Sequence, residues 1–148
     1  MEILVSIDDT DNLESRGTGE LASELAASIL THHWGKASFV SRHQLLIHPD
    51  IPYTSHNSAM CFAAQIDEAA LQPFITYATG YLSGESAEGS DPGLCVVEID
   101  ELIDRERLIS FGLSAKREVL TKKQAYGLAS ELGIELCELG GTGDGVIG

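Results

Sequence analysis

Short runs of β-branched and apolar residues alternate along this chain with stretches whose apolar residues recur every three to four positions. The runs predict strands, and the recurring spacing predicts helices. Strands are expected at 3–7, 38–48 (one long strand or a pair), 58–66, 94–99 and 135–139, and helices at 20–30, 67–82 and 121–132. The segment 101–120 has a mixed pattern that favours neither. This alternation within 148 residues predicts a single α/β or α+β domain with room for a ferredoxin-like βαβ unit.

The charge balance disfavours polyanionic partners. The chain has 9 Lys and Arg residues against 23 Asp and Glu residues, which gives a net charge of −14. Affinity for nucleic acids and for anionic membranes comes mostly from basic residues, and nine of them leave little from which to build a local basic patch. A strongly acidic surface would instead suit a basic protein partner, and a homo-oligomer stays open as well.

Neither a membrane-spanning segment nor an export signal is expected. No apolar run approaches the roughly 20 residues that cross a bilayer, and the N-terminus has no basic region before its apolar residues. Cys61, Cys95 and Cys137 are widely spaced, with no CxxC pair that would indicate zinc or a disulfide framework. The first two lie in apolar runs and are expected to be small core residues. We therefore expect a reduced, cytoplasmic protein.

An acidic cluster follows the first predicted strand. Asp8, Asp9 and Asp11 lie within four residues and repel one another unless a cation or strong donors compensate. Mg²⁺ is the natural cation, since it takes one or two carboxylates and completes its shell with water and phosphate oxygens. The alternative is an ordinary turn, because Asp and Asn readily bond to the local backbone.

Two glycine-containing segments suit an anion. Gly17, Thr18 and Gly19 precede the first predicted helix, where free N–H groups and the helix dipole favour negative charge. Simple N-cap chemistry at Thr18 is the alternative. The segment 140–145 follows an apolar strand, as a phosphate-cradling loop would, or is a glycine-rich turn without a ligand. It is not a P-loop, because no Lys follows Lys123.

Six motifs occur in an order that resembles a known family. They are IDDTD at 7–11, Gly-Thr at 17–18, HPDIPY at 48–53, SDPGLCVVE at 90–98, KREVLT at 116–121 and GGTGDGVIG at 140–148. The series resembles the N-terminal region of the archaeal agmatinylcytidine synthetases that modify an isoleucine tRNA. These enzymes activate a tRNA cytidine with ATP and join it to agmatine.

The resemblance implies a fold and a division of the chain. In that family a kinase-like α/β layer that binds ATP and Mg²⁺ is interwoven with a ferredoxin-like unit. Carried over, residues 1–57 and 121–148 would form the nucleotide-binding layer, and 58–120 the ferredoxin-like portion, within one compact unit of residues 1–148.

The resemblance also implies roles for particular residues. The carboxylates of Asp8, Asp9 and Asp11 would hold the metal and contribute to the ATP site. Thr18 falls where the family has a threonine that becomes phosphorylated, so Thr18 and Asp9 are the expected catalytic residues. The remaining nucleotide-binding residues implied by the matching motifs are Gly17, Gly19, Asn57, Gly141, Thr142, Gly143, Asp144 and Gly145.

The sequence departs from the family pattern in one motif. The family usually has Lys-Thr-Arg-Gly-Asn after the IPY motif, whereas the run from Tyr53 to Asn57 is one residue shorter and lacks both cations. Cations of this kind stabilise the charge of a phosphoryl group in transfer. Arg16, Arg42 and His43 are candidate substitutes.

The family's tRNA-holding domains also have no counterpart in these residues. Together with the net charge of −14, this makes tRNA an unlikely partner for the chain alone, and it predicts a stand-alone relative.

Three functions follow. The first is a Mg²⁺-dependent ATP-binding domain with phosphotransferase or autophosphorylating activity. The second is a non-catalytic nucleotide sensor or protein-interaction module. The third is a phosphohydrolase of the haloacid-dehalogenase type, for which Asp9, Asp11 and the late Asp144 give a partial match.

Overall fold

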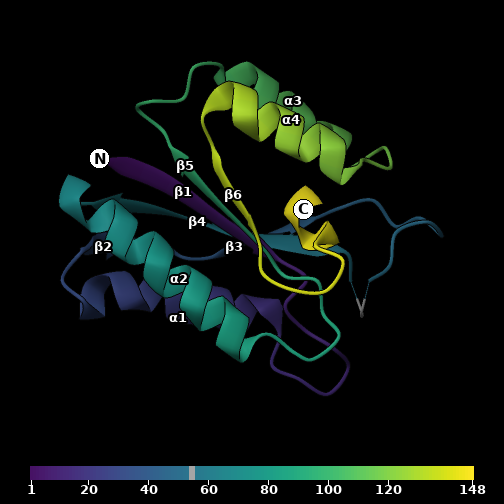
Figure 1. Ribbon diagram of the computed structural model, residues 1–148, viewed down its shortest axis with the longest axis horizontal. Helices are drawn as coiled ribbons and strands as arrows, with labels where there is room; N and C mark the ends of the chain where they lie inside the picture. Colours follow the sequence, from purple (N-terminus) through teal and green to yellow (C-terminus); the bar gives the residue numbers. More distant parts are fainter. Residues whose placement is uncertain (54–55) are drawn as a thin grey trace.

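The computed structural model describes residues 1–53 and 56–148, which form one sheet flanked by helices (Figure 1). The strands are β1 (Glu2–Asp8), β2 (Gly35–Ala37), β3 (Ser41–Gln44), β4 (Ser58–Ile66), β5 (Gly93–Glu98) and β6 (Glu135–Glu138). The helices are α1 (Thr18–Thr31), α2 (Leu71–Glu85), α3 (Arg105–Ser114) and α4 (Lys122–Leu132), with the short 3₁₀ helices η1 (Glu68–Ala70) and η2 (Asp144–Ile147).

Five strands of the sheet are ordered β2-β4-β1-β5-β6. The sixth strand, β3, pairs with the first half of β4 beyond the end of β2. All pairings are antiparallel. The path β1-α1-β2-β4-α2-β5 has the βαββαβ connectivity of a ferredoxin-like unit. The mixed α/β fold predicted from the sequence is therefore confirmed. The division into 1–57 with 121–148 and 58–120 stays a prediction, since both portions contribute strands to the same sheet.

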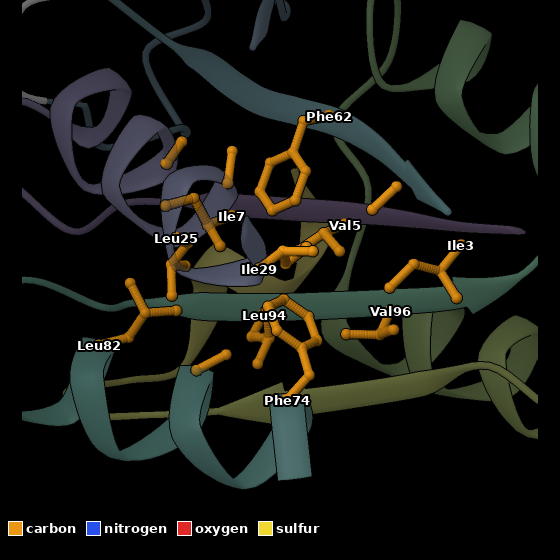
Figure 2. Packing of buried hydrophobic residues seen from close by; sticks show 14 of the residues in the cluster. Ile3, Val5, Ile7, Leu25, Ile29, Phe62, Phe74, Leu82, Leu94 and Val96 are labelled. Carbon is orange, nitrogen blue, oxygen red and sulfur yellow. The ribbon is translucent and has the colours of Figure 1, made fainter. Parts of the chain in front are cut away.

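The core lies between the sheet and helices α1 and α2. Along β1, Ile3, Val5 and Ile7 are buried, as the two-residue period of a strand dictates. These side chains belong to the same buried cluster as Leu25 and Ile29 of α1, part of which Figure 2 shows. Their burial removes most of the apolar surface of this face from water, which is the main stabilising contribution to the fold.

Helices α3 and α4 lie on the side of the sheet away from α1 and α2 (Figure 1). Helix α4 begins at the predicted N-cap Thr121, whose side chain forms a capping box with Gln124, and it ends at Gly133 with φ 70°. Helix α3 occupies the unassigned segment 101–120. It buries no side chain, which explains why its sequence shows no clear apolar period.

The long stretch at 38–48 does not form one strand. The short strand β2 ends before this stretch, and within the stretch the four residues of β3 form a strand. The side chains of β3 are exposed. In the described part of the chain, Cys61, Cys95 and Cys137 are free and half-buried rather than fully enclosed. Within the same ranges no helix is long and apolar enough to cross a membrane.

Candidate functional site

A cavity of about 640 Å³ opens where β1 ends. Its wall combines the loop after β1, the first turn of α1, the start of β4, the segment between α3 and α4, and the C-terminal residues. Of the predicted site residues, those that line it are Asp8, Asp9, Asp11, Gly17, Thr18, Gly19, Asn57, Asp144 and Gly145. Gly141, Thr142 and Gly143 lie outside the lining. Residues from the first twenty positions of the sequence and from its last five thus line the same cavity.

Carboxylates crowd the floor of the cavity. Asp8 is the last residue of β1, and its Oδ1 accepts a hydrogen bond of 2.7 Å from the N–H of Asp9. Burial, reinforced by the neighbouring charges of Asp9 and Asp11, raises the pKa of Asp8 to about 7. Burial also raises the pKa of Asp9 to about 6, with added repulsion from Asp91, Asp11 and Asp144. Asp9 has φ 53°, in the left-handed region, which is an uncommon backbone conformation for a non-glycine residue.

The donor set of the floor suits a hard cation. Charge repulsion among carboxylates is relieved by a divalent ion, and oxygen ligands are the ones Mg²⁺ prefers. Among residues 1–53 and 56–148, no group of three or more His, Cys, Asp or Glu side chains is arranged to hold a metal by itself. A Mg²⁺ ion at this floor would therefore need ligand oxygens and water to complete its shell.

The first turn of α1 forms one side of the cavity. Gly17 is the N-cap, so Thr18 is a first-turn residue rather than the cap itself. The hydroxyl of Thr10 donates to Oγ1 of Thr18 over 2.9 Å, and both side chains are buried. The backbone N–H groups of Thr18 and Gly19 are among the first-turn donors that lack a partner within the helix. Within residues 1–53 and 56–148, this end of α1 presents unengaged N–H donors and the positive end of the helix dipole to the cavity.

Three N–H groups of the glycine-rich segment donate to other parts of the chain. The N–H of Thr142 donates to the carboxylate of Asp91, and those of Gly143 and Gly145 donate to the carbonyls of Gly140 (3.1 Å) and Asp91 (3.0 Å). Of residues 140–145, Asp144 and Gly145 line the cavity. A phosphate-cradling role for Gly141–Gly145 stays a prediction, and it requires these hydrogen bonds to exchange.

The C-terminal residues pack closely against the end of the sheet. A Cβ on Gly93 would overlap the backbone of Gly145, and one on Gly148 would overlap the carboxylate of Asp8. Glycine is therefore required at both positions by close approach of neighbouring atoms. This packing brings Asp144 and Gly145 to the floor of the cavity.

Asn57 borders the cavity and also supports its wall. Its Nδ2 donates to the carbonyl of Leu46 over 2.6 Å, and its own carbonyl accepts from the N–H of Leu45 over 2.8 Å. Thr54 and Ser55, which belong to the shortened run after the IPY motif, lie outside the described residues.

In the described ranges, the Lys and Arg side chains that line the cavity are Arg42, Lys122 and Lys123. Arg42 was among the expected substitutes for the missing cations. The other two substitutes are not part of the lining: Arg16 pairs with Glu20, Glu24 and Glu85, and His43 hydrogen-bonds to Ser41. Sequence reasoning missed both lysines. Their position directly after a predicted N-cap was the available signal, because it places them at the start of a helix.

The cavity remains acidic despite these cations. Asp50 and Glu118 also line it, so among the described residues its carboxylates outnumber its Lys and Arg side chains by six to three. A polyanion without a counter-ion would be repelled there, whereas its complex with a divalent cation would not.

The proteins found to be similar to this chain are solved structures. No protein-family model matches the sequence, and the search of curated proteins gave no match. A complex of TiaS with an isoleucine tRNA and ATP matches with a TM-score of 0.84 at 24% identity, and a tRNA fluorescent labeling enzyme matches at 0.84 and 25%. A complex of TiaS with the same tRNA, AMPCPP and agmatine matches at 0.82 and 24%.

All three comparisons cover 100% of this chain but only 34–35% of the neighbour, so the chain spans about a third of their length. At these identities the likeness establishes the fold. It confirms that the resemblance drawn from the ordered motifs extends to three dimensions.

Proposed function

We propose that this chain is a Mg²⁺-dependent ATP-binding domain and that ATP occupies the cavity at the end of β1. The observation that carries the proposal is the meeting of the acidic floor, the open first turn of α1 and a cationic wall around one volume of about 640 Å³. Neighbours of the same fold form complexes with ATP and with AMPCPP, which supports a nucleotide as the ligand.

The N–H donors and cations of the cavity would bind the phosphates, and its carboxylates would bind the metal ion. The N–H groups of Thr18 and Gly19 would donate to phosphate oxygens, as donors at a helix N-terminus do. Arg42 and Lys123 would neutralise further phosphate charge. Asp8, Asp9 and Asp11 would hold Mg²⁺, which offsets the repulsion between the acidic floor and the phosphates.

Phosphoryl transfer is the finer proposal. Thr18 Oγ1 already accepts a hydrogen bond from Thr10, so its own proton is free to leave toward a base. In the proposed step Thr18 Oγ1 bonds to the γ-phosphorus, the bond to the ADP oxygen breaks, and Asp9 takes the hydroxyl proton.

A non-catalytic nucleotide sensor is the second candidate. Thr18 is only 6% exposed and its side chain is tied to Thr10, which restricts its approach to a bound phosphate. In this case ATP binds and no product forms.

The proposed setting is the cytoplasm, where Mg²⁺, ATP and reducing conditions coincide. A protein partner or a second copy of the chain remains part of the proposal, and tRNA remains a poor partner for these residues alone. The basic residues are, however, clustered in the sequence, since six of the nine Lys and Arg residues lie between Arg105 and Lys123.

Calorimetric titration with ATP, with and without Mg²⁺, tests the binding proposal. We expect saturable binding only with Mg²⁺, and a clear loss of affinity in Asp9→Asn and Asp11→Asn. The control is Asp100→Asn, which removes an exposed carboxylate outside the cavity. Unchanged affinity in the Asp9 and Asp11 variants would refute the assignment.

Intact-mass measurement after incubation with Mg-ATP separates the two candidates. Addition of one phosphate to the wild type but not to Thr18→Val supports transfer, whereas binding without modification supports the sensor. Turnover of p-nitrophenyl phosphate, lost in Asp9→Asn, would instead indicate the phosphohydrolase alternative.

A further inference from the structure

Lys122, a cation of the cavity wall, is already held by two oxygen acceptors. Its Nζ lies 3.1 Å from Oε1 of Glu138 and 2.5 Å from the carbonyl oxygen of Thr142. Both partners belong to the last part of the chain, at the end of β6 and in the glycine-rich turn that follows. Lys122 thereby connects the start of α4 to this turn.

Glu138 is the centre of this arrangement. Its hydrogen bonds with Lys122 and then with Tyr126, one turn further along α4, lower the pKa of the Glu138 carboxyl. The other carboxylate oxygen of Glu138 lies against Gly143, where a Cβ would overlap it. The glycine-rich turn therefore rests on a carboxylate whose position Lys122 helps to fix.

The peptide groups of Thr142 are occupied on both sides. Its N–H donates to Asp91 and its C=O accepts from Lys122. The turn is thus held between the loop that leads into β5 and α4 through one residue. Asp144 and Gly145, two and three positions later, line the cavity, so the turn adjoins the cavity floor.

The contact between Lys122 and Glu138 is suited to exchange. The side chains are 33% and 37% exposed, and an ion pair that water reaches contributes little net stability. A lysine ammonium is a compact charge with three donors on a flexible stem, so it can turn toward a more highly charged acceptor. A polyphosphate in the cavity that Lys122 already lines is such an acceptor.

We propose that Lys122 binds the phosphates of the nucleotide and that Glu138 holds its ammonium group when the cavity is empty. Nucleotide binding then releases the glycine-rich turn from α4. The inference rests on the proposed function and deepens it. Polyphosphate oxygens replace the Glu138 carboxylate and the Thr142 carbonyl as acceptors for Lys122. Glu138 thus weakens ATP binding, and the stronger its interaction with Lys122, the larger this effect.

Binding of Mg-AMP, Mg-ADP and Mg-ATP by the wild type and variants tests this inference. Lys122→Met is expected to weaken ATP binding about tenfold and AMP binding far less, because a charge-assisted hydrogen bond to the outer phosphates is lost. Glu138→Gln is expected to strengthen ATP binding about threefold, since it removes the competing charge and keeps a side chain of the same size. Lys36→Met removes an exposed cation outside the cavity and serves as the control.

The double variant Lys122→Met with Glu138→Gln distinguishes competition from structural support. If Glu138 acts only through Lys122, the double variant binds ATP as weakly as Lys122→Met. Weaker ATP binding by Glu138→Gln, or equal loss of AMP and ATP affinity in Lys122→Met, would overturn the inference.

A measurement on the wild-type protein covers the case in which a variant fails to fold. The ¹⁵N resonance of the Lys122 ammonium is expected to shift with Mg-ATP and not with Mg-AMP, and an unchanged resonance at saturating ATP would contradict the inference. Absence of ATP binding by the wild type would defeat the proposed function itself.

Discussion

Replacing Asp8 by Asn is expected to stabilise the folded protein at pH 8 by about 2–4 kcal/mol and to have little effect near pH 4. Asn keeps the size of the side chain and can accept the same hydrogen bond from the N–H of Asp9. It removes the negative charge that burial and the neighbouring carboxylates make unfavourable. The sign of the effect is opposite to that of an ordinary surface aspartate.

The magnitude follows from linkage. The pKa of Asp8 rises from an ordinary value of 3.8 to about 7 on folding. Between these values the unfolded chain has released the proton that the folded chain retains, so stability falls as pH rises from about 4 through 7. Each unit of difference corresponds to about 1.4 kcal/mol, which gives about 4 kcal/mol for an isolated group. Coupling to Asp9 spreads part of this effect over both residues, hence the lower bound.

Urea unfolding followed by circular dichroism at pH 4.5, 6 and 8 measures the effect. The wild type should lose stability across this series, whereas Asp8→Asn should lose much less. Asp100→Asn, at an exposed position, should behave like the wild type. Addition of Mg²⁺ and ATP at pH 8 should recover stability in the wild type but not in Asp8→Asn. A wild type that gains stability between pH 4.5 and 8, or an Asp8→Asn variant less stable at pH 8, would refute the reasoning.

Three further changes test the packing. Gly93→Ala should cost about 1–3 kcal/mol, because its Cβ overlaps the backbone of Gly145, whereas Gly80→Ala meets open space on α2 and should stabilise by about 0.5–1 kcal/mol. Equal urea midpoints for these two variants would contradict the close approach. Leu25→Ala, in the centre of the core, should cost about 2–5 kcal/mol by the same measurement, and a cost below about 1 kcal/mol would mean that the site is not packed as described. Thr121→Ala should cost about 1 kcal/mol through loss of the capping box, and no change would show that α4 does not depend on it.

Much of the fold could be predicted because burial and sequence period agree in the central elements. The strand predicted at 58–66 is β4 itself, and the cap residues Thr121 and Gly133 bound α4 as expected. Helix α3 could not be predicted, since none of its side chains is buried and no apolar period results. The prediction of one long strand or a strand pair over 38–48 was wrong outside Ser41–Gln44, because the chain leaves the sheet after the four residues of β3 and Leu45 turns to the cavity.

The position of residues around the candidate cavity could be predicted where short local motifs lie next to a strand or helix end. The cluster at 8–11 follows a strand and the Gly-Thr pair begins a helix, so sequence order alone placed both. Lys122 and Lys123 line the cavity because the chain returns from α3 toward the sheet. No structure was predicted for 101–120, so this return could not be anticipated. The engagement of Thr142 by Asp91 and Lys122 also depends on contacts between distant segments, and no local pattern encodes it.

Residue-by-residue ¹H–¹⁵N NMR during a titration with Mg-ATP tests the central claim most directly. If ATP occupies the cavity at the end of β1, the largest shifts will fall on the amides of residues 8–11, 17–19 and 144–148, and they will require Mg²⁺. The amides in the middle of α2, which lines no part of the cavity, will serve as the internal reference and stay unchanged. Saturation with shifts confined to other surfaces, or no shifts at all in the folded protein, would contradict the account.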